Sequence, residues 1–151
     1  MTCEVRCDEM VKQLNVFSEN RPGKLAQITG VLTDAKVNIN AVKISSVEKY
    51  GILKFLVDDP EKGFRAFKQA GITASLKEVL AVELEDRPGS MHQMLRILKE
   101  ANIDIEDSYG FVVERGKRAI IVLEVPDPAL VRRILEQHNY RLIGSSELYS
   151  L

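Results

Sequence analysis

Apolar residues recur along the chain first with the period of a strand and then with that of a helix. Within residues 13–19, Leu14 and Val16 occupy alternate positions, which predicts a strand with one buried face. Residues 24–35 then carry apolar side chains at positions 25, 28, 32 and 35, a spacing that places them on one face of a helix. The chain therefore opens with a strand followed by an amphipathic helix.

A hairpin and a second helix follow this pair. Segments 39–47 and 52–57 are rich in β-branched residues and are separated by the turn sequence EKYG, which predicts a β-hairpin. Asp59-Pro60 predicts a helix start, because aspartate accepts hydrogen bonds from free first-turn amides and proline has no N–H to leave unpaired. Gly71 marks the end of that helix, and the segment ITASL after it is a fourth strand.

The second half of the chain repeats this order. An offset of 66 places Arg21-Pro22-Gly23 on Arg87-Pro88-Gly89, and an offset of 68 places Asp59-Pro60 on Asp127-Pro128. We expect the two additional residues in the second hairpin turn, where ERGKR replaces EKYG. Apolar patterns that match on both sides of a two-residue insertion in a turn indicate an internal duplication. The elements expected in this half are a strand at 78–85, a helix at 90–101, a hairpin within 108–125, a helix at 128–137 and a strand near 140–146.

The repeated order βαββαβ predicts an α/β fold of the α+β kind. Each unit is expected to be ferredoxin-like, an antiparallel sheet with both helices on one face. The expected organisation is an N-terminal extension at 1–9, a first unit at 10–77 and a second unit at 78–151. No proline or glycine interrupts residues 73–85, so we expect a rigid junction. Four strand residues are expected to pack against another unit or another chain: Val42, Ile44, Phe111 and Val113.

The composition of the chain argues against several classes of function. The 151 residues are 45% hydrophobic and carry 21 basic and 22 acidic side chains, interspersed so that no cationic surface is available for nucleic acid. No apolar run approaches the roughly 20 residues of a membrane span, and the charged N-terminus lacks the apolar core of a signal peptide. The only cysteines, Cys3 and Cys7, are interpreted as loose thiols. We expect a cytoplasmic protein with no metal, no cofactor, no nucleic-acid partner and no membrane association.

The two Arg-Pro-Gly turns are the candidate ligand-binding sites. Gly23 has no Cβ and lets another group approach the backbone, and the helix after it offers unpaired N–H groups to a carboxylate. Asn20, Asn38 and Asn40 supply neutral amides, which both donate and accept hydrogen bonds. A small zwitterion needs both kinds of group in one cleft. The alternative is that the motif is only a turn that starts a helix.

The segment NRPGKLAQITGVLTDAKVNINAVKIS strongly resembles an ACT domain, the small-molecule regulatory module of amino-acid metabolism. It is most similar to the serine-sensing module of phosphoglycerate dehydrogenases, and EDRPGSMHQMLRILKEANIDIEDSYG matches the pattern more loosely. The resemblance covers nearly all of the chain from about residue 10. It implies an effector site between ACT units, where loop amides hold an amino acid and the second strand of an adjoining unit completes the site.

The resemblance places the loop asparagine at Asn20 and the second-strand asparagine at Asn38. The serine sensor has a histidine where this chain has Ser18, which puts serine itself in doubt. The second unit has Asp86, Asp104 and Leu84 at the positions of Asn20, Asn38 and Ser18, and its carboxylates would oppose a ligand carboxylate. The first loop is therefore the better candidate, and the second is either structural or part of a mixed site. The candidate ligand-binding residues are Ser18, Asn20, Arg21, Pro22, Gly23, Lys24, Leu25, Asn38, Ile39, Asn40, Asp86, Arg87, Pro88, Gly89, Ser90, Met91, Asp104 and Ile105, with Glu106 and Ser108 added in a mixed site.

Two other classes fit less well. Catalysis needs an activated nucleophile beside a base, and the only histidines, His92 and His138, lie near helix ends without such a partner in sequence. RNA-recognition domains use exposed aromatic residues on central strands, but this chain lacks their signature and a basic surface. We therefore expect a non-enzymatic homodimer that binds a small amino acid and modulates a separate metabolic enzyme. A ligand-free ACT protein that only binds a partner remains the alternative.

Overall fold

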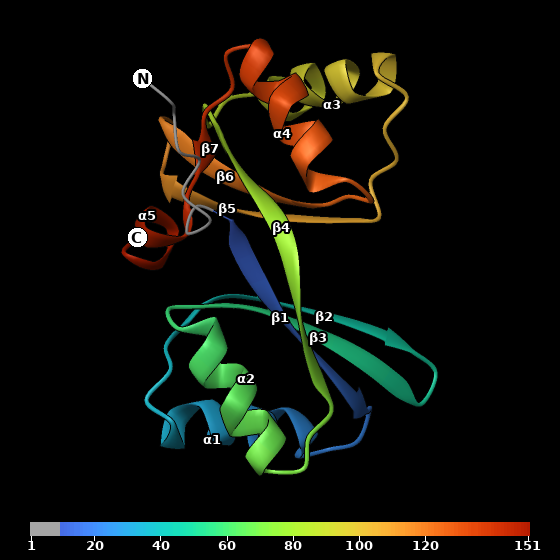
Figure 1. Cartoon of the computed structure of the whole chain (residues 1–151), viewed down its shortest axis with the longest axis vertical. Helices are drawn as coiled ribbons and strands as arrows, with labels where there is room; N and C mark the ends of the chain where they lie inside the picture. The colour runs from blue at the N-terminus through green and yellow to red at the C-terminus, as the bar shows by residue number, and fades with distance from the viewer. Residues whose placement is uncertain (1–9) are drawn as a thin grey trace. The chain divides into compact units, whose positions relative to one another are not determined.

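The computed structural model describes residues 10–151 (Figure 1). The expected extension at residues 1–9, with both cysteines, lies outside the described residues. Contacts divide the chain into two compact units, one formed mainly by Lys12–Lys77 and the other mainly by Glu78–Tyr149. We call them the N-terminal unit and the C-terminal unit.

The N-terminal unit is a four-stranded sheet with two helices on one face. Its sheet has the order β4-β1-β3-β2, and β1 and β2 each pair antiparallel with β3. This is the ferredoxin-like arrangement that the sequence predicted. The elements are β1 (Val11–Glu19), α1 (Lys24–Asp34), β2 (Ile39–Val47), β3 (Tyr50–Val57), α2 (Pro60–Gln69) and the first part of β4 (Ala74–Leu84).

The C-terminal unit repeats the arrangement with the remainder of β4 as its first strand. Its order is β7-β4-β6-β5, again antiparallel. The two strands expected at 72–76 and 78–85 are thus one continuous strand. The further elements are α3 (Ser90–Glu100), β5 (Asp107–Glu114), β6 (Arg118–Glu124), α4 (Pro128–Gln137), β7 (Leu142–Ile143) and α5 (Ser145–Tyr149).

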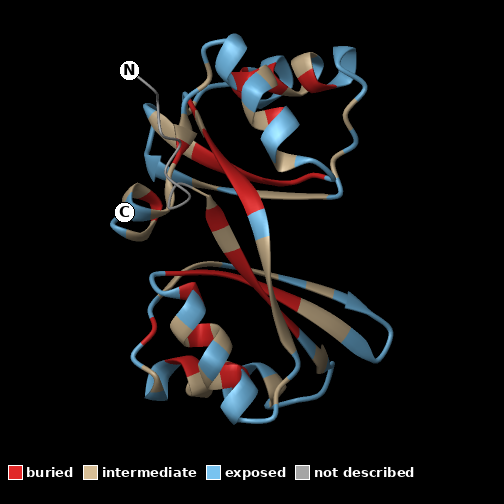
Figure 2. Ribbon diagram, in the orientation of Figure 1, coloured by how far each residue is buried: buried red, intermediate tan, exposed pale blue. Residues whose placement is uncertain are grey.

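Each unit has its own core between the sheet and its helices, which Figure 2 shows as buried segments. Alternate strand positions and the apolar helix stripes supply the core residues, as the periods in the sequence predicted. The N-terminal core contains Leu14, Val16, Ile28, Leu32, Val37, Leu53, Phe55, Val57 and Phe67. The C-terminal core contains Leu80, Val82, Leu84, Met94, Leu98, Ile121, Leu123, Val125, Val131 and Leu135.

The second helix of each unit starts at a capped aspartate, as predicted. The Asp59 carboxylate accepts a hydrogen bond from the Lys62 N–H at 3.1 Å, and the Asp127 carboxylate accepts one from the Leu130 N–H at 3.1 Å. Proline occupies the first helical position in both helices. These contacts satisfy first-turn donors that would otherwise be unpaired.

The two additional residues of the second unit lie in its hairpin, which confirms their predicted position. Ser46 pairs with Gly51 in the first hairpin, and Val112 pairs with Ala119 in the second, so the strand registers correspond up to these pairs. A bulge between Val112 and Glu114 and a longer turn then accommodate the insertion.

The end of the chain differs from the prediction. The last strand is limited to Leu142–Ile143, and the residues after it form the short helix α5. The Leu148 N–H donates to the Gly144 carbonyl at 3.0 Å, and the Leu148 side chain is fully buried. The sequence pattern near the end of the chain did not predict this helix.

Three of the four strand residues expected to need an additional partner, Val42, Ile44 and Val113, are exposed among residues 10–151. Val42 and Ile44 of β2 are 48% and 50% exposed. Their neighbours in register, Phe55 and Leu53, are buried in the core. Packing of β2 against another chain therefore stays a prediction.

Residues 10–151 include no helix with both the length and the apolar character needed to span a membrane.

Candidate functional site

The first Arg-Pro-Gly turn connects β1 to α1, and hydrogen bonds fix its shape. The Asn20 N–H donates to the Lys49 carbonyl at 2.7 Å, which joins the turn to the β2–β3 hairpin. Arg21 Nε lies 2.7 Å from a carboxylate oxygen of Glu19. The Lys24 N–H donates to the Arg21 carbonyl at 3.1 Å and closes the turn.

The second turn, between β4 and α3, has the same pattern. The Asp86 N–H donates to the Lys117 carbonyl at 3.3 Å, and Arg87 Nε lies 2.5 Å from Glu85. In both turns the arginine is thus engaged with the glutamate two residues before it. Both ion pairs are exposed, so each contributes little to stability. Each arginine thus has a partner within its own turn, and ligand binding is not needed to explain its presence.

The helices after the two turns lack the cap that the other long helices have. Gly23 and Gly89 are the N-cap residues of α1 and α3, with φ of 83° and 89°, and no side chain in the described part of the chain caps either helix. In contrast, Asp59 and Asp127 cap α2 and α4. An uncapped helix leaves first-turn N–H groups for another acceptor. The two Arg-Pro-Gly turns therefore each present an open, electropositive helix start.

Both glycines have free space beside them. A Cβ built at Gly23 or Gly89 would meet no atom within 4 Å among the described residues. A shallow hollow of about 410 Å³ lies over residues 21–24 and Gln27. A narrower groove of about 110 Å³ contains Ser18, Asn20, Arg21, Lys24 and Leu25, together with Ile44 and Ser46 of β2. No side chain of residues 10–151 fills the space beside Gly23 in the first turn.

The second-strand candidates lie at the other end of each sheet. Asn38 exchanges hydrogen bonds with Asp58, which follows β3, whereas Asn20 contacts the hairpin turn. Ile39 and Asn40 follow Asn38 at the start of β2. In the C-terminal unit, Asp104 and Ile105 precede Glu106, whose N–H donates to the Glu124 carbonyl at the far end of β6. Within one unit, the structure does not bring the loop and second-strand candidates together.

Asp86 has a role that the sequence did not reveal. Its carboxylate accepts a hydrogen bond from the Gly116 N–H at 2.6 Å, so its charge is engaged within the protein. Gly116 belongs to the longer hairpin turn. The aspartate at this position is thus explained by the insertion, and it fastens the hairpin to the loop.

Asp86→Ala should therefore loosen this hairpin. Loss of a charge-assisted hydrogen bond predicts a decrease in the free energy of unfolding of about 1–2 kcal/mol. Asp86→Asn keeps an acceptor oxygen and should cost much less. Urea denaturation of both variants checks this, and an equal loss in the two would contradict the assigned contact.

A cavity of about 540 Å³ lies in the C-terminal unit, beside α3. Two of the predicted candidates, Arg87 and Ser90, line it. The sequence prediction missed its other lining residues, which come from β4 and the turn after it, from α3, from the β5–β6 hairpin and from the α4–β7 loop. They are Glu83, Leu84, Glu85, Gln93, Glu114, Lys117, Arg118, Asn139, Tyr140 and Arg141. In the sequence, the one local indication of this cavity was a charged residue, Glu83, within the apolar run VLAVEL.

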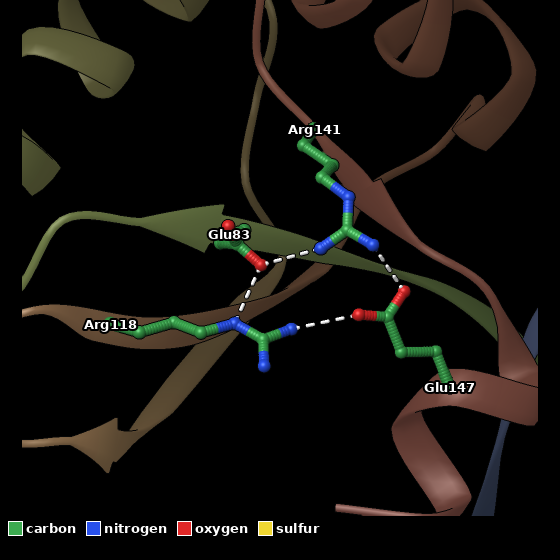
Figure 3. Close-up of polar contacts among 4 residues, drawn as sticks. All are labelled: Glu83, Arg118, Arg141 and Glu147. Atoms are coloured by element: carbon green, nitrogen blue, oxygen red, sulfur yellow. Dashed lines mark hydrogen bonds and ion pairs between the residues drawn. The ribbon is translucent and has the colours of Figure 1, made fainter.

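Figure 3 shows a closed ring of ion pairs between Glu83, Arg118, Glu147 and Arg141. All of these residues except Glu147 line the cavity. Glu83 Oε2 accepts from Arg118 Nε at 2.7 Å and from an Arg141 terminal nitrogen at 2.8 Å. Glu147 of α5 accepts from the same two arginines, at 2.9 Å and 2.6 Å. The hydrogen bond from Arg141 is the main cause that lowers the pKa of Glu147, and the same bond raises the pKa of Arg141.

The described residues contain no group of three or more His, Cys, Asp or Glu side chains placed to hold a metal ion.

The fold and the paired helix starts define a tandem of two ferredoxin-like units. The sequence profile of the ACT domain pair matches residues 9–151. This chain therefore belongs to the ACT domain pair family. The ACT resemblance is confirmed, whereas the closer resemblance to a serine sensor stays a prediction. Among proteins of curated function, none matches this sequence.

Solved structures share the architecture. Protein BT0572 from Bacteroides thetaiotaomicron is 28% identical to this chain, with a TM-score of 0.88 over 95% of this chain and 98% of that one. The regulatory subunit of aspartate kinase from Thermus thermophilus is 15% identical, with a TM-score of 0.63 over 86% of this chain and 93% of that one. The corresponding subunit from Thermus flavus is 13% identical, with a TM-score of 0.59 over the same shares. The two kinase subunits show a common fold.

Proposed function

We propose that this protein is a non-enzymatic sensor that binds a small amino acid at its N-terminal Arg-Pro-Gly turn and modulates a separate enzyme. One observation carries the proposal. The helices that follow Arg-Pro-Gly have open N-termini, whereas α2 and α4 are capped by aspartate. An open helix start beside free space suits a carboxylate.

The remaining groups suit the rest of an amino acid. The side-chain amide of Asn20 has no hydrogen-bond partner among the described residues, and it lines the groove beside α1. An amide oxygen accepts from an ammonium group. Because Asn38 lies at the opposite end of its own sheet, we assign the second half of the site to the β2 start of a second copy of this chain. The ligand then favours the associated state of the two copies.

A second candidate function is partner binding without a ligand. The half-exposed Val42 and Ile44 on β2 favour it, because apolar residues on an edge strand suit a protein partner. In that case the open helix start has no occupant.

A thermal-shift screen of the twenty amino acids separates the two functions. Binding to the folded state raises the melting temperature by mass action, so we expect one small amino acid to stabilise the wild type. Asn20→Ala and Asn38→Ala should each weaken that response, whereas Asn102→Ala serves as a control in the C-terminal unit. If no amino acid stabilises the wild type, the sensor function is wrong and the partner-binding function is favoured.

A further inference from the structure

The ion ring of the C-terminal unit has no counterpart in the N-terminal unit. The Glu83 N–H donates to the Arg141 carbonyl at 3.0 Å, and the Phe17 N–H donates to the Thr73 carbonyl at 3.0 Å in the corresponding place. The strand registers likewise place Tyr50 where the second unit has Arg118. Since the two units share a fold, the fold itself does not require these charges.

The corresponding region of the N-terminal unit is apolar. Phe17 and Tyr50 are exposed there, and they line a hollow of about 360 Å³ together with Val47 and Ile52. The charges at the second cavity are thus a feature of one unit only. Either they fasten α5, which the first unit lacks, or they also serve the cavity that Arg118 and Arg141 line.

The contacts that hold α5 use only part of the hydrogen-bonding capacity of the ring residues. A guanidinium has five N–H donors, and Arg118 and Arg141 each use two of them in the ring. Both contacts to Glu83 involve Oε2, so Oε1 has no partner among the described residues. The cavity is therefore bordered by unused cationic donors and an unused carboxylate oxygen.

Ser90 provides an independent indication that a ligand binds in this cavity. It is the first residue of α3, it lines the cavity, and it is only 7% exposed. Its hydroxyl is buried and has no hydrogen-bond partner among residues 10–151. Buried polar groups without a partner are rare in folded proteins because they cost free energy. A polar ligand in this cavity would supply the missing partner.

The charge balance selects the kind of ligand. The cavity lining carries four cationic side chains, Arg87, Lys117, Arg118 and Arg141, against three carboxylates, Glu83, Glu85 and Glu114. Glu147, which forms ion pairs with Arg118 and Arg141, adds a fourth carboxylate, so that four cationic groups face four carboxylates. A nearly neutral site with separated charges of both signs suits a zwitterion better than a multiply charged anion.

We propose that this cavity is a second ligand site, which binds a small zwitterion within the C-terminal unit alone. The ligand carboxylate binds the unused donors of Arg118 and Arg141, and its ammonium group binds Glu83 Oε1. This site does not depend on the N-terminal turn. Because Glu147 binds the same two guanidinium groups, it competes with the ligand carboxylate and ties ligand binding to α5.

The test uses the full ¹⁵N-labelled chain and amide NMR spectra. The probes are the twenty L-amino acids, each compared with its N-acetyl derivative, which lacks the ammonium group. We expect at least one amino acid to shift the amide signals of Ser90, Arg118 and Arg141, and to bind at least tenfold more tightly than its N-acetyl derivative. Glu83→Gln should remove that preference by weakening the amino acid alone, because it neutralises the carboxylate but keeps an acceptor for the arginines.

Glu147→Gln is the matched control for the α5 contact. It weakens the competing partner without changing the cavity lining, so we expect binding to tighten a few-fold. If Glu147→Gln weakens binding as much as Arg141→Gln does, the arginines act only through α5, and the second site is wrong. The same conclusion follows if no probe shifts these signals, or if Glu83→Gln keeps the preference. Shifts confined to the N-terminal turn would overturn the second site and leave the proposed function standing. Shifts confined to this cavity would support the second site and count against the N-terminal turn as the ligand site.

Discussion

Replacing Gly23 by alanine should destabilise the protein, whereas the same replacement at Gly30, seven residues later, should stabilise it. Gly23 has φ of 83°, and a residue with a Cβ pays about 1–2 kcal/mol in this left-handed conformation. Gly30 lies inside α1 and has no neighbour within 4 Å of an added Cβ. Alanine there should increase the free energy of unfolding by about 0.5–1 kcal/mol.

Urea denaturation of the two variants measures this difference. Because no atom obstructs a Cβ at either position, the opposite signs would isolate backbone conformation as the cause. Equal effects in the two variants would contradict the left-handed helix start.

Gly23→Ala should also impair ligand binding. The methyl group would occupy the space from which a ligand approaches the first turn of α1, so we expect at least tenfold weaker binding of an amino acid. Gly30→Ala should leave the affinity unchanged. Titration calorimetry with the stabilising amino acid checks both expectations, and full affinity in Gly23→Ala would count against the proposed position of the ligand.

Gly110→Ala should cause the second large loss of stability. An added Cβ would lie 2.9 Å from the Ile120 carbonyl oxygen and 3.6 Å from the Ile121 Cα. Both atoms belong to the backbone of β6, so a side-chain rotation cannot relieve the contact. Overpacking of this kind costs about 1–3 kcal/mol.

Gly51→Ala is the matched control in a strand of the other unit. Its Cβ would have its nearest neighbours at 3.4 Å, which is an ordinary contact. We expect Gly110→Ala to lower the melting temperature by about 4–8 °C for a loss near 2 kcal/mol, and Gly51→Ala to change it little. Similar melting temperatures for the two variants would contradict the close approach of β5 and β6.

Local sequence signals were enough to predict the repeated framework. The Asp-Pro pairs at 59–60 and 127–128 start helices because a capping carboxylate and a proline act within one turn. The hairpin insertion was predictable because strand alternation stays in register on both sides of it. In both cases the deciding interactions join residues that are close in sequence.

The charged cavity and α5 were not predictable in this way. Arg141 reaches Glu83 across 58 positions, and Arg118 reaches Glu147 across 29. Asp86 meets Gly116 across 30 positions, so the sequence suggested an unfavourable carboxylate where the structure has an engaged one. Which side chains share a cavity is decided by strand order, and charge patterns along the chain do not encode it.

The most direct measurement of the central claim follows the backbone amides of α1 during titration with the amino acid that most raises the melting temperature. If the open helix start binds the ligand carboxylate, the amide signals of Leu25 and Ala26 should move in saturable fashion, and those of Lys62 in the capped helix α2 should not. Stabilisation of the protein by that amino acid without any change at Leu25 and Ala26 would show that the N-terminal Arg-Pro-Gly turn is not the site.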